Sequence, residues 1–111
     1  MKSCNNCFKN LPKGRDFKTV WEDKTIWINY SPQTTDYWGI TYGVGGTEIS
    51  IPKATFKKGF KFVAGTLVHE LAHTNGAPVT TMEAESTLIY CGLKDLYDKG
   101  AIGMRQSGTI G

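Results

Sequence analysis

The stretch Val68-His69-Glu70-Leu71-Ala72-His73 contains both histidines of this 111-residue chain. In a helix, residues four apart lie one above the other, so His69 and His73 would share one face. Two imidazoles in that arrangement can bind one zinc ion, and Glu70 would lie at the flank of the same face. A carboxylate in that place can take a proton from a water at the metal. The spacing therefore predicts two metal ligands and a general base on one helix.

The residues around this stretch are mostly apolar, which predicts a buried helix over residues 60–75. Buried ionisable groups are costly unless they are paired or bind a metal. A surface helix with solvated His and Glu side chains is the simpler alternative, but its flanks would then be more polar. Gly76 is suited to end the helix in the left-handed conformation, and Pro78 prevents its continuation.

The sequence before this helix favours β-structure. Alternating polarity and β-branched or aromatic residues predict strands at residues 17–21, 25–30, 38–42 and 47–51. The first two would form a hairpin, since a short polar turn separates them.

The sequence after the first helix predicts a second one, over residues 81–98. Thr80 and Glu83 have the spacing of a capping box at its start. Residues 1–16 and 101–111 are expected to be loose. Strands followed by helices predict a single domain of the α+β class, in which a small antiparallel sheet of three to four strands packs against two main helices.

A catalytic zinc site takes three protein ligands and leaves one position open for water. Because no third histidine exists, and Val79 stands where one class of such sites has it, the ligand would be Asp, Glu or Cys. Glu85 shares a face of the second helix with apolar residues, whereas Glu83 belongs to the capping box, so Glu85 is the predicted ligand. The alternatives are a salt bridge from Glu85 to a lysine, and Cys91 as a softer ligand.

The three cysteines, Cys4, Cys7 and Cys91, leave several states open. Free structural thiols are the favoured interpretation. A disulfide from Cys4 or Cys7 to Cys91 is the second, and it would require an oxidising compartment. A metal or redox role for Cys4 and Cys7 is the least favoured, because no matching second pair or thioredoxin-like pattern follows.

Composition excludes several functional classes. A net charge of +3 and one local lysine cluster, without interleaved aromatic residues, do not predict a nucleic-acid partner. No apolar run is long enough to span a membrane. The N-terminus lacks the apolar segment of a signal peptide, so we expect either a cytoplasmic protein or a domain of a longer exported chain.

Residues 69–73, together with Ala84-Glu85, resemble the zincin metallopeptidases, in the gluzincin-like branch with two histidines and one glutamate as zinc ligands. The run of residues 73–78, followed by residues 91–93, resembles small metallopeptidase domains at the C-terminal ends of bacterial secreted toxins and type VI secretion effectors. The resemblance covers about residues 60–95. Larger peptidases of this branch carry more helices, and their third ligand lies further along the chain.

The resemblance implies one catalytic Zn²⁺ held by His69, His73 and Glu85, with Glu70 as the catalytic base of peptide-bond hydrolysis. It also implies a peptide or protein substrate and an immunity or inhibitor protein as partners. A non-catalytic zinc-binding interaction module with the same shape is the alternative function, and a buried polar cluster without metal is a third.

Zincins commonly bind substrate along a sheet edge beside the active helix, and the strand with Thr47, Ile49 and Ile51 is the candidate edge. An ordinary edge strand is the alternative for these residues. Tyr42, Tyr90 or Tyr37 could stabilise the oxyanion, since no further histidine remains.

Overall fold

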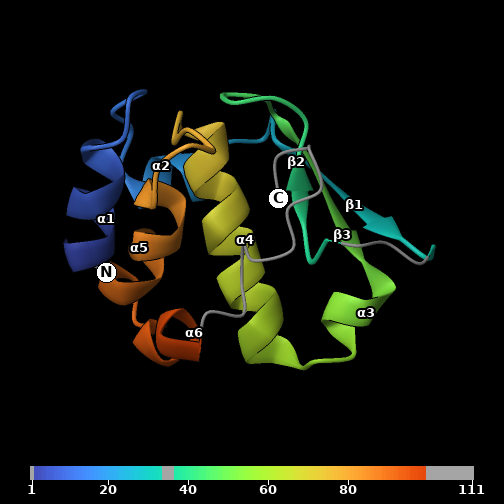
Figure 1. Cartoon of the computed structure of the whole chain (residues 1–111). Helices are drawn as coiled ribbons and strands as arrows, with labels where there is room; N and C mark the ends of the chain where they lie inside the picture. Colours follow the sequence, from blue (N-terminus) through green and yellow to red (C-terminus); the bar gives the residue numbers. More distant parts are fainter. Residues whose placement is uncertain (1, 34–36, 100–111) are drawn as a thin grey trace.

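The chain folds into a small sheet with helices layered against one of its faces (Figure 1). The computed structural model describes residues 2–33 and 37–99. The described strands are β1 (Trp27–Ser31), β2 (Ile40–Thr41) and β3 (Glu48–Pro52). The described helices are α1 (Lys2–Lys9), α2 (Phe17–Trp21), α3 (Lys53–Phe56), α4 (Phe60–Thr74), α5 (Glu83–Tyr90) and α6 (Lys94–Lys99). The predicted α+β class is confirmed.

The sheet has the strand order β1-β3-β2 and is mixed rather than antiparallel. β1 runs parallel to β3, with Ile28 opposite Ile49, whereas β2 runs antiparallel to β3, with Thr41 opposite Ile49. The antiparallel prediction is therefore wrong for β1. The prediction that Thr47, Ile49 and Ile51 form an edge is also wrong, because β3 is paired on both sides. Ile49 and Ile51 are fully buried in the core, as a central strand requires.

The predicted hairpin of residues 17–30 does not form, because residues 17–21 are helix α2. The Asp16 side chain accepts a hydrogen bond from the backbone N–H of Thr19 at 2.8 Å, which caps the start of this helix. Phe17 and Val20, three residues apart, are both buried on the same helical face. The cap and this spacing outweigh the alternation that predicted a strand.

Residues 2–9, predicted to be loose, form helix α1. Cys4 and Phe8 lie one turn apart on it and are buried. Phe8 packs edge-to-face on Phe17 of α2, with ring centroids 5.0 Å apart. The helix therefore forms around a tertiary contact that the polar composition of this segment conceals. The other segment predicted to be loose, residues 101–111, lies outside the described residues.

The two long predicted helices have different outcomes. The helix predicted over residues 60–75 is α4, and Gly76 ends it with φ +97°, as predicted. The helix predicted over residues 81–98 is divided into α5 and α6, because Gly92 adopts φ +82° between them. The predicted capping box does not form, because Met82 is the N-cap residue of α5 and its side chain makes no capping hydrogen bond. Thr81, not Thr80, contacts Glu83.

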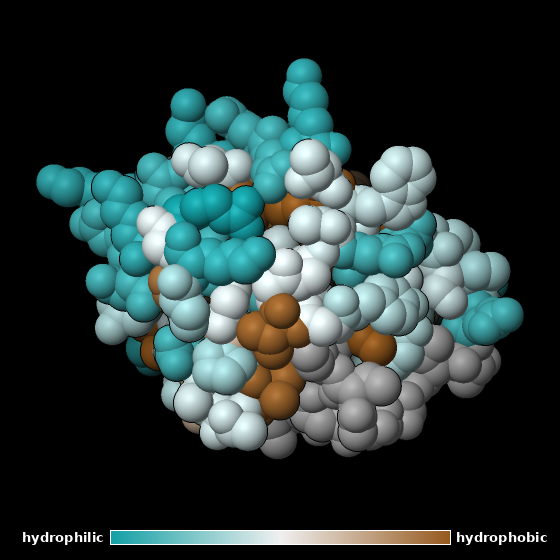
Figure 2. Space-filling view, turned by 90° about the horizontal axis from the view of Figure 1, so that it is seen from above, coloured by the Kyte–Doolittle hydropathy of each residue, from teal (hydrophilic) through white to brown (hydrophobic). Residues whose placement is uncertain are grey.

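None of the described helices has the length and apolar character needed to cross a membrane. The end of the molecule at the top of Figure 1 is largely hydrophilic or of intermediate hydropathy, with hydrophobic residues in small separate areas (Figure 2).

A disulfide joins Cys4 of α1 to Cys91 at the end of α5, so the second of the three cysteine interpretations holds. Cys7 keeps a free thiol, and burial raises its pKa. The fraction of reactive thiolate at Cys7 is thereby lowered.

Replacing both Cys4 and Cys91 by serine should lower the free energy of unfolding by about 4–5 kcal/mol, because the bridge closes a loop across 87 positions. Urea denaturation measures this loss. Cys7→Ser is the matched control and should be much closer to the wild type. Equal stability of the double variant and the Cys7→Ser control would contradict a stabilising bridge.

Candidate metal centre

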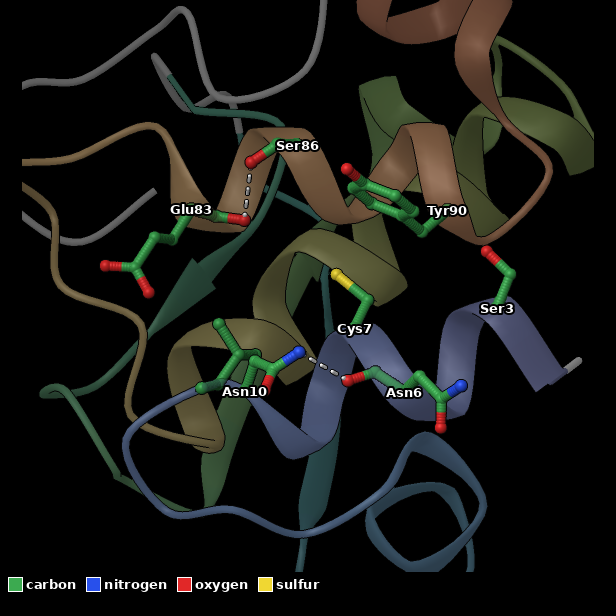
Figure 3. A pocket seen from close by; sticks show the side chains of 8 residues that line it. Ser3, Asn6, Cys7, Asn10, Glu83, Ser86 and Tyr90 are labelled. Atoms are coloured by element: carbon green, nitrogen blue, oxygen red, sulfur yellow. Dashed lines mark hydrogen bonds between the residues drawn. The ribbon is translucent and has the colours of Figure 1, made fainter.

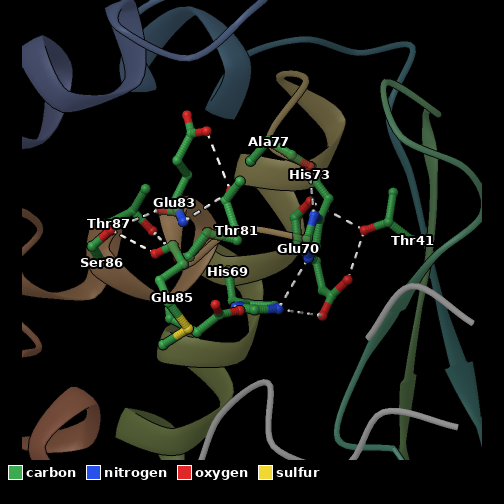
Figure 4. A network of polar contacts seen from close by, with 12 residues as sticks. Thr41, His69, Glu70, His73, Ala77, Thr81, Glu83, Glu85, Ser86 and Thr87 are labelled. Atoms are coloured by element: carbon green, nitrogen blue, oxygen red, sulfur yellow. Dashed lines mark hydrogen bonds and ion pairs between the residues drawn. The ribbon is translucent and has the colours of Figure 1, made fainter. Parts of the chain in front are cut away.

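The middle of α4 places three ionisable side chains together in the protein interior. His69, Glu70 and His73 expose 0%, 1% and 2% of their surface. One helical turn separates the histidines, and their Nε2 atoms lie 3.2 Å apart (Figure 4). The predicted pairing of the two imidazoles on one helix face is therefore present in the structure.

The turn after α4 orients the second histidine. Gly76 turns the chain back, and the N–H of Ala77 donates to the carbonyl of Ala72 at 2.9 Å. The carbonyl of Ala77 then lies 2.8 Å from Nδ1 of His73. When Nδ1–H donates to this carbonyl, Nε2 carries no proton and is free to act as a ligand. The carbonyl contact is the kind of support that fixes a metal-binding imidazole.

Helix α5 contributes the third member of the group. Glu85 Oε1 lies 3.4 Å from Nδ1 of His69, and the Glu85 side chain keeps 15% of its surface exposed. One donor atom from each of His69, His73 and Glu85 lies within 4.8 Å of the others. These three residues could hold a metal ion. Within residues 2–33 and 37–99, no other group of three or more His, Cys, Asp or Glu residues brings its donor atoms close enough together to hold a metal ion.

Glu83 points away from this group, as expected (Figure 4). Its carboxylate accepts from the hydroxyl of Thr81 at 3.2 Å, at the exposed start of α5. The helical phase that separates Glu83 from Glu85 is therefore as the sequence predicts.

Glu70 lies beside the histidines, with Oε2 3.8 Å from Nε2 of His69. Its other oxygen, Oε1, lies 2.7 Å from the hydroxyl of Thr41 on β2. Burial raises the pKa of Glu70 to about 8, which the Thr41 hydrogen bond opposes and the charge of Glu85 reinforces. A positive charge between the histidines would lower this pKa, because it favours the carboxylate.

Strand β2 reaches Glu70 because Gly39, just before it, has no side chain. A Cβ atom at Gly39 would stand 2.5 Å from Cγ2 of Thr66 and 3.1 Å from Cγ of Glu70. The sequence pattern does not single out Gly39 or Thr41 as part of the site. The signal it contains is a glycine inside a predicted strand, which often marks a close backbone approach.

Gly39→Ala should therefore displace β2 from α4 and lower the free energy of unfolding by about 1–3 kcal/mol. Adding Thr66→Ser removes the clashing methyl group and should restore part of this loss. Thermal denaturation of the single and double variants measures both effects. An alanine variant as stable as the wild type would contradict the close packing.

Other candidate residues lie elsewhere. The Tyr42 hydroxyl pairs with Oγ of Ser50 at 3.2 Å, on the sheet face opposite Thr41. Tyr90 lines a cavity of about 480 Å³ between α1 and α5, together with Cys7 (Figure 3). Neither contact involves the His69–His73 pair, and the oxyanion-stabilising role considered for these two tyrosines stays a prediction.

Of the two remaining candidates, the structure decides the role of Cys91 and leaves that of Tyr37 open. Cys91 is not available as a ligand, because it is bonded to Cys4. The role considered for Tyr37 stays a prediction.

The chain matches no protein-family model, and no curated protein or solved structure was found to be similar to it.

Proposed function

We propose that the protein is a zinc-dependent metallopeptidase. The observation that carries this proposal is the pair of His69 and His73 Nε2 atoms, 3.2 Å apart, beside two glutamates that come from different helices. Imidazole nitrogens combined with a carboxylate form a donor set typical of catalytic zinc.

The geometry fits such an ion. Two nitrogen ligands at about 2.0–2.1 Å from a tetrahedral zinc lie about 3.3 Å from each other. The Nε2 atoms of His69 and His73 lie 3.2 Å apart, close to this value. Glu85 would be the third ligand, and three protein ligands would leave one position for water. An open position is the feature that separates catalytic zinc sites from structural ones.

When bound, zinc would lower the pKa of a water at the open position and polarise the carbonyl of the scissile peptide bond. Glu70 would accept the proton of this water and pass it to the leaving amine. The Thr41 hydroxyl holds Oε1 of Glu70, so that Oε2 is the oxygen nearer to His69. The burial of Glu70 places its carboxylate in surroundings of low dielectric constant, which would strengthen its attraction to a bound cation.

The Cys4–Cys91 disulfide supports action outside the cytosol, because such bonds form and persist in oxidising compartments. Together with the resemblance of residues 73–78 and 91–93 to small toxin domains, it extends the proposal to a role as the toxin domain of a secreted bacterial effector. A protein or peptide would be its substrate, and an immunity or inhibitor protein would protect the producing cell.

A second candidate function is a non-catalytic zinc-binding interaction module. The burial of His69, Glu70 and His73, each at most 2% exposed, favours it, since a substrate must reach the metal for hydrolysis. Zinc bound without any peptide cleavage would identify this function.

The test is cleavage of a peptide library by zinc-loaded protein, followed by mass spectrometry. The proposed function predicts new peptide termini that disappear after treatment with a chelator and return when zinc is added. Zinc binding with an unchanged library would instead support the second function.

A further inference from the structure

Strand β1 forms one outer edge of the sheet and pairs only with β3 (Figure 1). The N–H of Trp27 donates to the carbonyl of Thr47 at 2.7 Å, so the N–H and C=O groups of Trp27 point toward β3. In a parallel ladder alternate residues bond to the neighbouring strand, so Ile28 and Tyr30 direct their N–H and C=O groups outward. No residue that the structure describes hydrogen-bonds to these outward groups.

The side chains of this edge are apolar and exposed. Trp27, Ile28 and Tyr30 expose 66%, 49% and 56% of their surface. Phe56 of α3, which is 47% exposed, packs edge-to-face on Tyr30 with ring centroids 5.6 Å apart. Residues 25–33 contain no charged side chain. The edge therefore lacks the charges with which sheet proteins commonly prevent strand pairing.

We propose that β1 is a dimerisation edge, which pairs antiparallel with β1 of a second copy of this chain. A two-fold axis at Asn29 places Ile28 of each copy opposite Tyr30 of the other. The outward N–H and C=O groups of these two residues then form four main-chain hydrogen bonds across the axis. Asn29 of one copy lies opposite Asn29 of the other, in a non-hydrogen-bonded pair. The two three-stranded sheets thereby join into one sheet of six strands.

A second copy matches this edge better than a charged partner does. The pairing brings Ile28, Tyr30 and Phe56 of both copies to the same face of the joined sheet, where they bury each other's apolar surface. Like charges never meet along the strand, because residues 25–33 carry none. The metal-binding group lies beside β2, at the other edge, so the dimer does not require the proposed peptidase function.

A five-residue strand gives a small interface, so we expect a dissociation constant on the order of 10–100 µM. Sedimentation equilibrium of the full chain from about 1 to 500 µM should show a monomer–dimer equilibrium. Ile28→Pro removes one outward N–H and leaves the bonds to β3 intact, since proline is tolerated at a strand edge. This variant should weaken dimerisation at least about tenfold.

Ile28→Val is the matched control, because it keeps the N–H and a β-branched side chain, and it should dimerise within about threefold of the wild type. Circular dichroism of both variants verifies that they are folded. A monomer at every concentration, or an Ile28→Pro variant that dimerises as well as the wild type, would overturn the proposal.

The register has its own test. Cα atoms of a non-hydrogen-bonded pair lie about 4.5 Å apart, within reach of a disulfide. In a Cys7→Ser background, Asn29→Cys should therefore form covalent dimers under mild oxidation. Ser31→Cys is the control, because two residues at this position would lie roughly 13 Å apart across the axis. Equal crosslinking of both variants would contradict the proposed pairing.

Discussion

Glu70→Gln is expected to bind zinc as the wild type does and to hydrolyse peptides about 10²–10⁴-fold more slowly. The amide has nearly the shape of the carboxylate and still accepts the hydrogen bond of Thr41, which lies 2.7 Å from Oε1. It cannot accept a proton from water, so only the catalytic step is lost. Turnover of a peptide cut by the wild type, measured beside zinc content, separates these two effects.

The stability of this variant provides a control. Glu70 is 1% exposed, and a buried carboxylate is costly, so its replacement by a neutral amide should not lower the melting temperature of the metal-free protein. His73→Ala, in contrast, should lose both zinc and activity. A Glu70→Gln variant with near-normal turnover would exclude Glu70 as the base.

Glu85→Ala is expected to weaken zinc binding by well over tenfold, because it would remove one of the three proposed metal ligands. Glu83→Ala is the matched control on the same helix. Among the described residues its carboxylate hydrogen-bonds only with Thr81, at the exposed helix start, so the variant should keep its zinc and lose at most about 0.5–1.5 kcal/mol of stability. Competition with a chelating dye measures both affinities.

A third variant, Glu85→Gln, distinguishes a Glu85 that binds the metal from a Glu85 that only orients His69. Glu85 Oε1 lies 3.4 Å from Nδ1 of His69, where an amide oxygen could make a similar polar contact. If Glu85 binds the metal directly, the Gln variant should lose nearly as much affinity as the Ala variant. An affinity near that of the wild type would instead assign Glu85 to the orientation of His69.

The elements that local sequence determines were predictable. Helix α4 follows from its apolar flanks and from Gly76, and the inward phase of Glu85 follows from the helical repeat. Both depend on residues within a few positions of each other, so no knowledge of the tertiary fold was required.

The remaining differences come from contacts between distant residues. The parallel pairing of β1 with β3 leaves no local signal, because the strands are separated by β2 in the sequence. Thr41 belongs to the site only because Gly39 lets β2 approach α4, which depends on a contact with Thr66. For α2, Asp16 is a capping residue visible in the sequence, but the alternation of residues 17–21 is equally compatible with a strand, and only the buried contacts of Phe17 and Val20 decide for the helix.

The most direct test of the metal site is native mass spectrometry of the chain after incubation with zinc and dialysis. One zinc ion per chain is the predicted result, because His69, His73 and Glu85 place their donor atoms within 4.8 Å of one another. A chain that remains metal-free after this treatment would contradict the metal site and, with it, the proposed hydrolysis.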